Sequence, residues 1–505
     1  MPRRIGLRAR WSSFRWSRFL SALLFLVPAC VVRLSDRNSA LENGGVSGPA
    51  ADCKVVVPVG EGAPSTDPSA AKTKYVGRYD FSDPTRPTFD WSGNYMNARF
   101  RGTEVSWGAD SGIEIVFEQI IDGKVERVIR GGPDPDLSKP LTIKLPEGEH
   151  EITVVRSSEA LFSVGAFIPF AFPPGTVQLP PIERPRRIEY IGDSITCGYG
   201  DLGPNATCPY DVPFRGRKIP ESQNIYVAYG SIAARRLAAD AVTLCFSGKG
   251  VVLNYREQGV GEGKLLNPSD LPDPDAKTTI PEYYLRTLAS VSENLTCVAN
   301  GDCGSNVCIE GLCRCTSSDQ CCADKNIAKC DARGNKCAPP PAGAPGTGNT
   351  CRNKPNVWDF AKDQPQPQVV LINIGTNDFA RDVRQRGIAD GLDENAFRAG
   401  YKKFVDFVRT KRPDAHIFLA VPPMVTDKFP LDNARTDFTN ILRSIADELN
   451  HAGDGKVYSM ELVEMGVRYG LGCDYHPNLE VHRIMADQVV GAIRSKTCWS
   501  TVDTQ

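Results

Sequence analysis

The sequence has no excess of charge of either sign. Its 505 residues include 59 Lys and Arg against 60 Asp and Glu, and the formal net charge is −1. A protein that is drawn to nucleic acid or to an acidic polymer by long-range attraction needs a basic surplus, which this chain lacks. We therefore expect no nucleic acid partner.

Long apolar runs are also scarce. The run Phe19–Val27 is too short to span a bilayer, and it follows a stretch rich in arginine. This pattern is typical of an export signal, so we predict a signal peptide over residues 1–30. It ends in Val27-Pro28-Ala29-Cys30, which approximates a bacterial lipobox. Lipidation of Cys30 would anchor the mature chain and cleavage nearby would release it, so we expect a secreted protein or a bacterial cell-surface lipoprotein.

Histidine is rare too, which limits the candidates for a catalytic base. The five residues are His150, His416, His451, His476 and His482. The first three fall in a polar turn, at the start of a strand and in a Gly-rich loop after a helix, and His482 lies within the last helix, where a structural or surface role is expected. His476 alone stands in a loop before a helix, flanked by Asp474 and Pro477. An imidazole in such a loop is the usual partner of a nucleophilic hydroxyl.

Three strand-like segments end in turns that carry reactive residues. Arg187–Ile191 runs into Gly-Asp-Ser with Ser194, Val369–Ile374 runs into Gly-x-Asn-Asp with Asn377, and Ala241–Phe246 runs into Ser-Gly with Gly248. The carboxyl ends of parallel strands meet at one edge of a sheet, where α/β proteins expose such residues. We expect these turns to form one site.

The motifs, in this order, resemble the SGNH (GDSL-type) hydrolases and, more narrowly, carbohydrate esterase family 2. The resemblance implies that Ser194 is the nucleophile and His476 the base. It also implies an oxyanion hole of the Ser194 amide, the Gly248 amide and the Asn377 side chain, with Gly250 as the alternative glycine. No metal and no organic cofactor are expected.

Asp474 is where the chain departs from the superfamily. Most SGNH enzymes carry an Asp three residues before the His, whereas Asp474 lies two residues before His476. Successive side chains of an extended segment point to opposite sides, so the Asp474 carboxylate can point away from the ring. Either this carboxylate or a backbone carbonyl orients His476. We expect activity to fall on acidification around the ordinary His pKa of about 6.5.

The pattern of the chain predicts two domains and a linker. Residues 31–72 are rich in Gly, Ser, Ala, Pro and Asp and predict a flexible linker. Residues 73–178 carry short strand-like runs separated by turns, among them Asp122-Gly123 and Glu147-Gly148, and predict a β-sandwich of jelly-roll type. In residues 186–500 strands alternate with helices, as in a parallel sheet covered on both faces. The resemblance makes this an α/β SGNH-hydrolase domain, a flavodoxin-like three-layer fold.

Cysteines cluster in one block that interrupts the second domain. Ten of the 17 lie between Cys297 and Cys351, which predicts a disulfide-stapled insertion over residues 296–352. Zinc is the competing interpretation, but the block contains no histidine. Outside it, Cys197 and Cys208 form a plausible pair beside the nucleophile, although spacing does not determine pairing.

Taken together, these features predict a serine esterase that removes acetyl groups from a xylan- or glucomannan-type polysaccharide through an acyl-enzyme. Two alternatives stay open. One is an esterase acting on a lipid or a thioester, and the other is a non-catalytic polysaccharide-binding lipoprotein. We expect a monomer whose partner is an acetylated polysaccharide or oligosaccharide.

Overall fold

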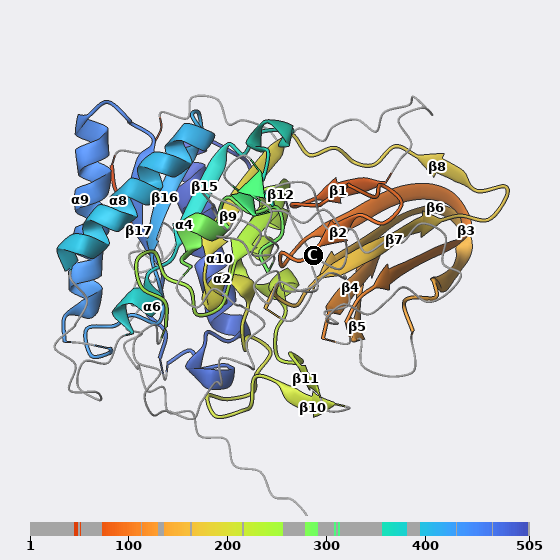
Figure 1. The fold of residues 1–505 in the computed structure, drawn as a ribbon, viewed down its shortest axis with the longest axis horizontal. Helices are drawn as coiled ribbons and strands as arrows, with labels where there is room; N and C mark the ends of the chain where they lie inside the picture. The colour runs from red at the N-terminus through yellow and green to blue at the C-terminus, as the bar shows by residue number, and fades with distance from the viewer. Residues whose placement is uncertain are drawn as a thin grey trace, which may run out of the picture.

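The chain folds into a β domain and an α/β domain that lie side by side (Figure 1). The computed structural model describes residues 45–48, 51, 73–112, 114–129, 136–161, 164–214, 217–255, 278–290, 308–309, 312–313, 356–380, 394–430, 432–466 and 468–502. The predicted signal peptide with Cys30 lies outside these residues. So does the predicted insertion, apart from the antiparallel pair β13 (Cys308–Ile309) and β14 (Leu312–Cys313).

The β domain is one antiparallel sheet that folds over on itself. Its strands are β1 (Lys74–Val76), β2 (Thr88–Phe89), β3 (Tyr95–Asp110), β4 (Val116–Ile121), β5 (Lys124–Ile129), β6 (Leu141–Arg156), β7 (Gly165–Ala171) and β8 (Val177–Leu179). The order is β2-β7-β3-β6-β4-β5, with β1 and β8 also paired to β3. Phe89 of β2 and Phe117 of β4 have ring centroids 6.2 Å apart although three strands separate them in the sheet. A flat sheet would place them about 19 Å apart, so the sheet forms two layers.

One of the two predicted turns in this domain is confirmed and the other is wrong. Asp122 and Gly123 have φ values of 50° and 78° and close the β4–β5 hairpin. Two left-handed residues match the right-handed twist of the strands. Glu147-Gly148 lies inside β6, because β6 pairs with β3 on both sides of an irregularity between Gly102 and Glu104. The bulge lets the strand continue past this sequence, and Gly102 and Gly148 stay paired beside it.

The α/β domain is built on a five-stranded parallel sheet. Its strands are β9 (Arg186–Gly192), β12 (Ala239–Cys245), β15 (Val369–Asn373), β16 (His416–Val421) and β17 (Val457–Glu461), in the order β12-β9-β15-β16-β17. This is the flavodoxin-like strand order. The strands are parallel, and the chain adds β12 on one side of β9 and all later strands on the other side. In register, Gly192 lies between Cys245 and Asn373, so the turns after β9, β12 and β15 leave the same edge of the sheet.

Helices cover both faces of this sheet (Figure 1). α3 (Tyr229–Arg236) and α10 (Leu479–Thr497) share one apolar cluster with the sheet, and α8 (Glu394–Lys411) and α9 (Ala434–His451) share the other. In β9, Tyr190 packs in the first cluster and its neighbour Ile191 in the second. Both faces of β9 are therefore buried, as the near-continuous apolar sequence requires. The predicted alternation of strands and helices is confirmed.

Polar contacts join the two domains. Arg78 of the β domain is buried and donates to the carbonyls of Tyr284 and Arg286 at 2.6 and 2.9 Å. The Tyr95 hydroxyl donates to Asp240 of β12 at 2.7 Å. Hydrogen bonds to charged groups contribute about 1.5–3 kcal/mol each. The Arg78 contacts therefore join the β domain to the segment that follows α4 (Ile280–Tyr283), and the Tyr95 contact joins it to the edge strand β12.

Part of the predicted linker lies against the α/β domain. The Ser47 amide donates to the Ser459 carbonyl of edge strand β17 at 2.8 Å, and the Ala51 amide donates to the Ser495 carbonyl of α10 at 2.7 Å. Edge strands carry unpaired backbone groups, and Ser47 satisfies two of them, because its hydroxyl also accepts from the Ser459 amide at 2.8 Å. Within the described ranges, no helix has the length and apolar character needed to cross a membrane.

Candidate active site

Ser194 begins a four-residue helix, α2 (Ser194–Cys197), directly after β9. The Asp193 carboxylate caps this helix by accepting from the Ile195 amide at 3.0 Å. The turn requires glycine at position 192, because an added Cβ would meet the Thr196 hydroxyl at 2.0 Å and the Asn373 carbonyl at 2.7 Å. As the first helical residue, Ser194 has no acceptor for its amide within the helix. The turn thus places at the same point a hydroxyl and an amide that has no acceptor among the described residues.

His476 meets Ser194 from the opposite end of the sequence. It follows the short helix η5 (Cys473–Tyr475) and precedes α10. Its Nε2 lies 2.9 Å from the Ser194 Oγ, a distance at which the imidazole can accept the hydroxyl proton. Burial lowers the pKa of His476 to about 4, and the neighbouring backbone carbonyls oppose this shift only in part. The ring is therefore neutral over the ordinary pH range, as a base must be.

A backbone carbonyl orients the imidazole. The Nδ1 of His476 lies 2.9 Å from the carbonyl oxygen of Asp474, whereas the Asp474 carboxylate accepts from the Tyr199 hydroxyl at 2.8 Å. Asp474 and Tyr475 have φ values of 50° and 61°, which curl the chain so that this carbonyl faces the ring. Tyr199 also lies beside the ring, with centroids 4.3 Å apart. Of the two alternatives for Asp474, the structure has the carbonyl arrangement.

The predicted oxyanion donors lie on the neighbouring turns. Asn377 belongs to α6 (Thr376–Phe379) after β15, and its amide nitrogen donates one hydrogen to the Lys249 carbonyl at 2.8 Å. This bond connects the turn after β15 to the turn after β12. The second hydrogen of the amide has no acceptor among the described residues. Gly248 adopts φ 79°, and its amide has no acceptor among the described residues. The Gly250 amide instead donates to the Asn254 side chain at 3.1 Å, which favours Gly248 over Gly250.

A buried carboxylate secures the far end of the same loop. Asp378 accepts from the amides of Val251, Val252 and Leu253 at 2.9, 2.8 and 2.8 Å. Burial raises the pKa of Asp378 to about 6, although three amide donors favour the charged form. Because Asp378 follows Asn377 directly, one turn after β15 both supplies a candidate donor and fixes the loop that carries the other.

Comparison with known families gives a match in each domain. The carbohydrate esterase 2 N-terminal family matches residues 75–181, and the GDSL-like lipase/acylhydrolase family matches residues 329–484. A solved family two carbohydrate esterase from Clostridium thermocellum, in complex with cellohexaose, superposes with a TM-score of 0.56 at 27% identity. It covers 84% of this chain and 98% of that one. This protein is a homologue of the family 2 carbohydrate esterases.

Two curated relatives of the chain are also named as esterases. The chain is 30% identical over 432 residues to the cellulase/esterase CelE of Acetivibrio thermocellus, covering 84% of this chain. It is 29% identical over 195 residues, or 38% of this chain, to the acetylxylan esterase/glucomannan deacetylase of Cellvibrio japonicus. The chain spans 39% and 51% of the lengths of these two relatives.

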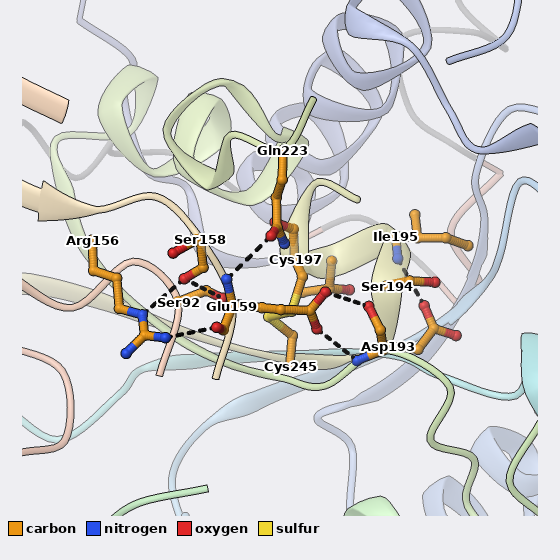
Figure 2. The surroundings of a disulfide bond; sticks show 12 residues. Ser92, Arg156, Ser158, Glu159, Asp193, Ser194, Ile195, Cys197, Gln223 and Cys245 are labelled. Carbon is orange, nitrogen blue, oxygen red and sulfur yellow. Dashed lines mark hydrogen bonds between the residues drawn. A yellow bond between two sulfur atoms is a disulfide. The ribbon is translucent and has the colours of Figure 1, made fainter. Parts of the chain in front are cut away.

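The disulfides of this esterase homologue correct the predicted pairing. Cys197 pairs with Cys245 and Cys208 pairs with Cys473, so a Cys197–Cys208 bond is wrong. Cys197 ends α2 and Cys245 ends β12, and the register of β9 and β12 brings them together (Figure 2). The bond closes a 48-residue separation, for which chain entropy predicts ~4 kcal/mol of stabilisation. It also ties the nucleophile turn to the Gly248 loop, while Cys208–Cys473 ties down the segment before His476.

One residue of the site belongs to the β domain and was not predicted from the sequence. Glu159 follows β6, and its carboxylate accepts from the Ser247 amide at 2.9 Å and from the Ser247 hydroxyl at 2.7 Å. Ser247 immediately precedes Gly248. No local motif marks Glu159, and the nearest signal is its place in Arg-Ser-Ser-Glu at the end of a predicted strand.

The other histidines make no hydrogen bond with Ser194, and each has other partners among the described residues. His482 is buried in α10 and its Nδ1 accepts from the Tyr229 amide at 3.2 Å, which agrees with a structural role. Burial lowers the pKa of His482 to about 3. His150 contacts the Asp122 carboxylate at 2.6 Å and His451 contacts the Asp447 carbonyl at 2.7 Å. In the described part of the chain no group of His, Cys, Asp and Glu is arranged to hold a metal ion.

Proposed function

We propose that this protein is a serine-type carboxylic ester hydrolase that removes acetyl groups from carbohydrate. The observation that carries the proposal is the 2.9 Å contact between Ser194 Oγ and His476 Nε2, on an imidazole whose other nitrogen is held by a carbonyl. The related solved structure in complex with cellohexaose and the relative named as an acetylxylan esterase support carbohydrate as the substrate.

The reaction follows from the placement of these groups. Ser194 Oγ bonds to the acetyl carbon while His476 Nε2 takes the hydroxyl proton. The Ser194 and Gly248 amides and the Asn377 side chain stabilise the oxyanion. When the intermediate collapses, the C–O bond to the sugar breaks, His476 returns the proton to the sugar oxygen, and acetyl-Ser194 remains. Water then attacks with His476 as base, and acetate leaves.

Exposed aromatic rings beside the site support a sugar substrate. Tyr475 precedes His476 and is 59% exposed. Tyr255 is 46% exposed, and its amide donates to the Gly248 carbonyl at 2.8 Å. Aromatic side chains commonly line ligand sites, and their apolar faces suit the C–H faces of sugar rings.

We also propose that the chain is exported, either released or anchored through Cys30, and that the sandwich is of jelly-roll type.

A series of 4-nitrophenyl esters tests the acyl specificity. We expect acetate to be hydrolysed with the highest kcat/KM and octanoate to be at least about 10-fold slower, since one misplaced methylene changes binding by about 1–3 kcal/mol. Release of acetate from acetylated xylan or glucomannan is the matching test on polymer. Octanoate faster than acetate would establish an esterase for longer acyl chains, and hydrolysis of no ester would favour a polysaccharide-binding protein.

Replacing Asn377 by alanine tests the oxyanion hole. We expect Asn377→Ala to lower kcat by about 10²–10³-fold with little change in KM, because one donor to the developing charge is lost. Asn450→Ala is the matched control, since its amide donates to the carbonyls of Ala446 and Val457 at the other end of the sheet. It should lower thermal stability without lowering kcat. Near-normal turnover in Asn377→Ala would remove this residue from the mechanism.

A further inference from the structure

Glu159 connects the β domain to the proposed site. Its side chain is completely buried, and both carboxylate oxygens accept from Ser247, Oε2 from the amide and Oε1 from the hydroxyl. Oε1 also lies 3.2 Å from the Tyr210 hydroxyl. A charged group without water needs such donors, because an unpaired buried carboxylate is costly. The carboxylate and Ser247 therefore hold each other in one arrangement.

The segment that carries Glu159 is itself fixed (Figure 2). The Arg156 guanidinium donates to the carbonyls of Ser158 and Glu159 at 2.9 and 2.6 Å. The Glu159 amide donates to the Gln223 side chain at 3.1 Å, and Gln223 donates to the Cys197 carbonyl at 3.1 Å. Arg156 is buried and charged, so it also compensates the nearby carboxylate. This short segment of the β domain thus reaches both the nucleophile helix and the Gly248 loop.

The position of Ser247 determines the direction of the Gly248 amide. The Gly248 N–H belongs to the peptide unit that follows Ser247, and Gly248 is left-handed, with φ 79°. The disulfide at Cys245 fixes the chain two residues earlier, and Asp378 fixes it from Val251 onward. Between these two fixed points, Glu159 of the β domain holds Ser247 in place. Without Glu159, the peptide that carries the Gly248 donor loses its nearest restraint.

We propose that Glu159 is a positioning residue for the oxyanion hole, so that the β domain completes the active site of the α/β domain. The proposal rests on the proposed hydrolase function, since it concerns the same site. Displacement of a catalytic group by about 1 Å can cost about 10²-fold in rate. The α/β domain alone would then retain Ser194, His476 and Asn377 but hold the Gly248 amide poorly.

The test uses the full chain and two variants. Glu159→Gln keeps the shape but offers only one acceptor oxygen to Ser247, and we expect kcat on 4-nitrophenyl acetate to fall about 10–100-fold while KM stays within about 3-fold. Ser247→Ala, which removes the hydroxyl contact alone, should fold normally and lose about 3–10-fold in kcat. The control is Tyr95→Phe, which removes another interdomain hydrogen bond. It should lower the melting temperature without lowering kcat.

A double-mutant cycle with Asn377→Ala separates positioning from general destabilisation. If Glu159 acts through the oxyanion hole, the loss in the double variant should be smaller than the product of the single losses, because both changes impair one group of donors. Full multiplication of the losses, or a kcat of Glu159→Gln within about 2-fold of the parent, would overturn the proposal.

Labelling of Ser194 by a fluorophosphonate probe distinguishes this proposal from the choice of ester. The phosphonyl oxygen occupies the oxyanion hole whatever the natural substrate. Slower labelling of Glu159→Gln together with absent acetyl ester hydrolysis by the parent would support positioning and reject the deacetylase. Equal labelling rates with normal hydrolysis by the parent would reject positioning alone. A parent chain that the probe does not label would reject both.

Discussion

Replacing Ser194 by alanine is expected to lower kcat by about 10⁵–10⁶-fold, the scale seen when a serine hydrolase loses its nucleophile. The hydroxyl lies 2.9 Å from the His476 base at the end of β9, and no other hydroxyl among the described residues contacts that imidazole. What remains should be at most the ~10³–10⁴-fold over water that an oxyanion hole and binding supply.

The matched control is Ser444→Ala. Ser444 lies in α9, and its hydroxyl donates to the Ile441 carbonyl at 2.8 Å. It should retain normal turnover and normal labelling by the fluorophosphonate probe. Ser194→Ala should lose both while keeping its melting temperature, because Ser194 Oγ makes only one hydrogen bond within the described chain. Turnover above about 1% of the parent in Ser194→Ala would place the nucleophile elsewhere.

The second large effect separates His476 from Asp474. We expect His476→Ala to be nearly inactive and Asp474→Asn to lose less than about 10²-fold in kcat. Removing the carboxylate of a true triad costs roughly 10⁴-fold, because it fixes the tautomer and stabilises the imidazolium. Here the backbone carbonyl of Asp474 orients the His476 ring, and Asp474→Asn leaves that carbonyl in place.

Asparagine is also a mild replacement at position 474. It tolerates the left-handed φ of 50°, and its side-chain oxygen can still accept from the Tyr199 hydroxyl. The control for the histidine is His451→Ala at the end of α9, which should turn over normally. A loss in Asp474→Asn as large as that in Ser194→Ala would establish the carboxylate as the third member of a triad.

The same imidazole sets the expected acid limit of activity. Burial lowers the pKa of His476 to about 4, so the neutral base is present above that pH and is lost as pH falls through it. This differs from the limit near 6.5 that an unperturbed histidine would give. Selective ¹³C labelling of the histidines makes the titration direct, because the chain has only five. A midpoint near 6.5 for the His476 signal would show that the ring is solvated in solution.

Asp378 can add a separate inflection to the pH dependence of kcat, since burial raises its pKa to about 6. Below that value the protonated group offers fewer acceptor positions to the amides of Val251, Val252 and Leu253. The histidine titration therefore has to be followed on the ring itself, with kcat measured alongside it. An inflection in kcat between about 6 and 7 that is absent from the His476 signal would belong to a buried carboxylate, either Asp378 or Asp193, whose pKa burial raises to about 7.

The sequence by itself determined which strand ends carry the candidate site residues. Ser194, Gly248 and Asn377 each follow an apolar strand, and parallel strands deliver their carboxyl ends to one edge whatever the length of the segments between them. That rule placed three turns together although Cys245 and Val369 are separated by more than a hundred residues. His476 emerged because histidine is rare and because the others lie within or beside regular elements.

Tertiary structure alone decided how these groups are held. The partners of Cys197 and Cys208 depend on the register of β9 with β12 and on where the segment before His476 returns, and neither is encoded locally. The orientation of His476 by a carbonyl depends on two left-handed residues that no turn signal announces. Glu159 reaches Ser247 across a domain boundary, 88 positions along the chain. Local patterns report what a segment prefers, whereas these contacts arise only when distant segments pack against one another.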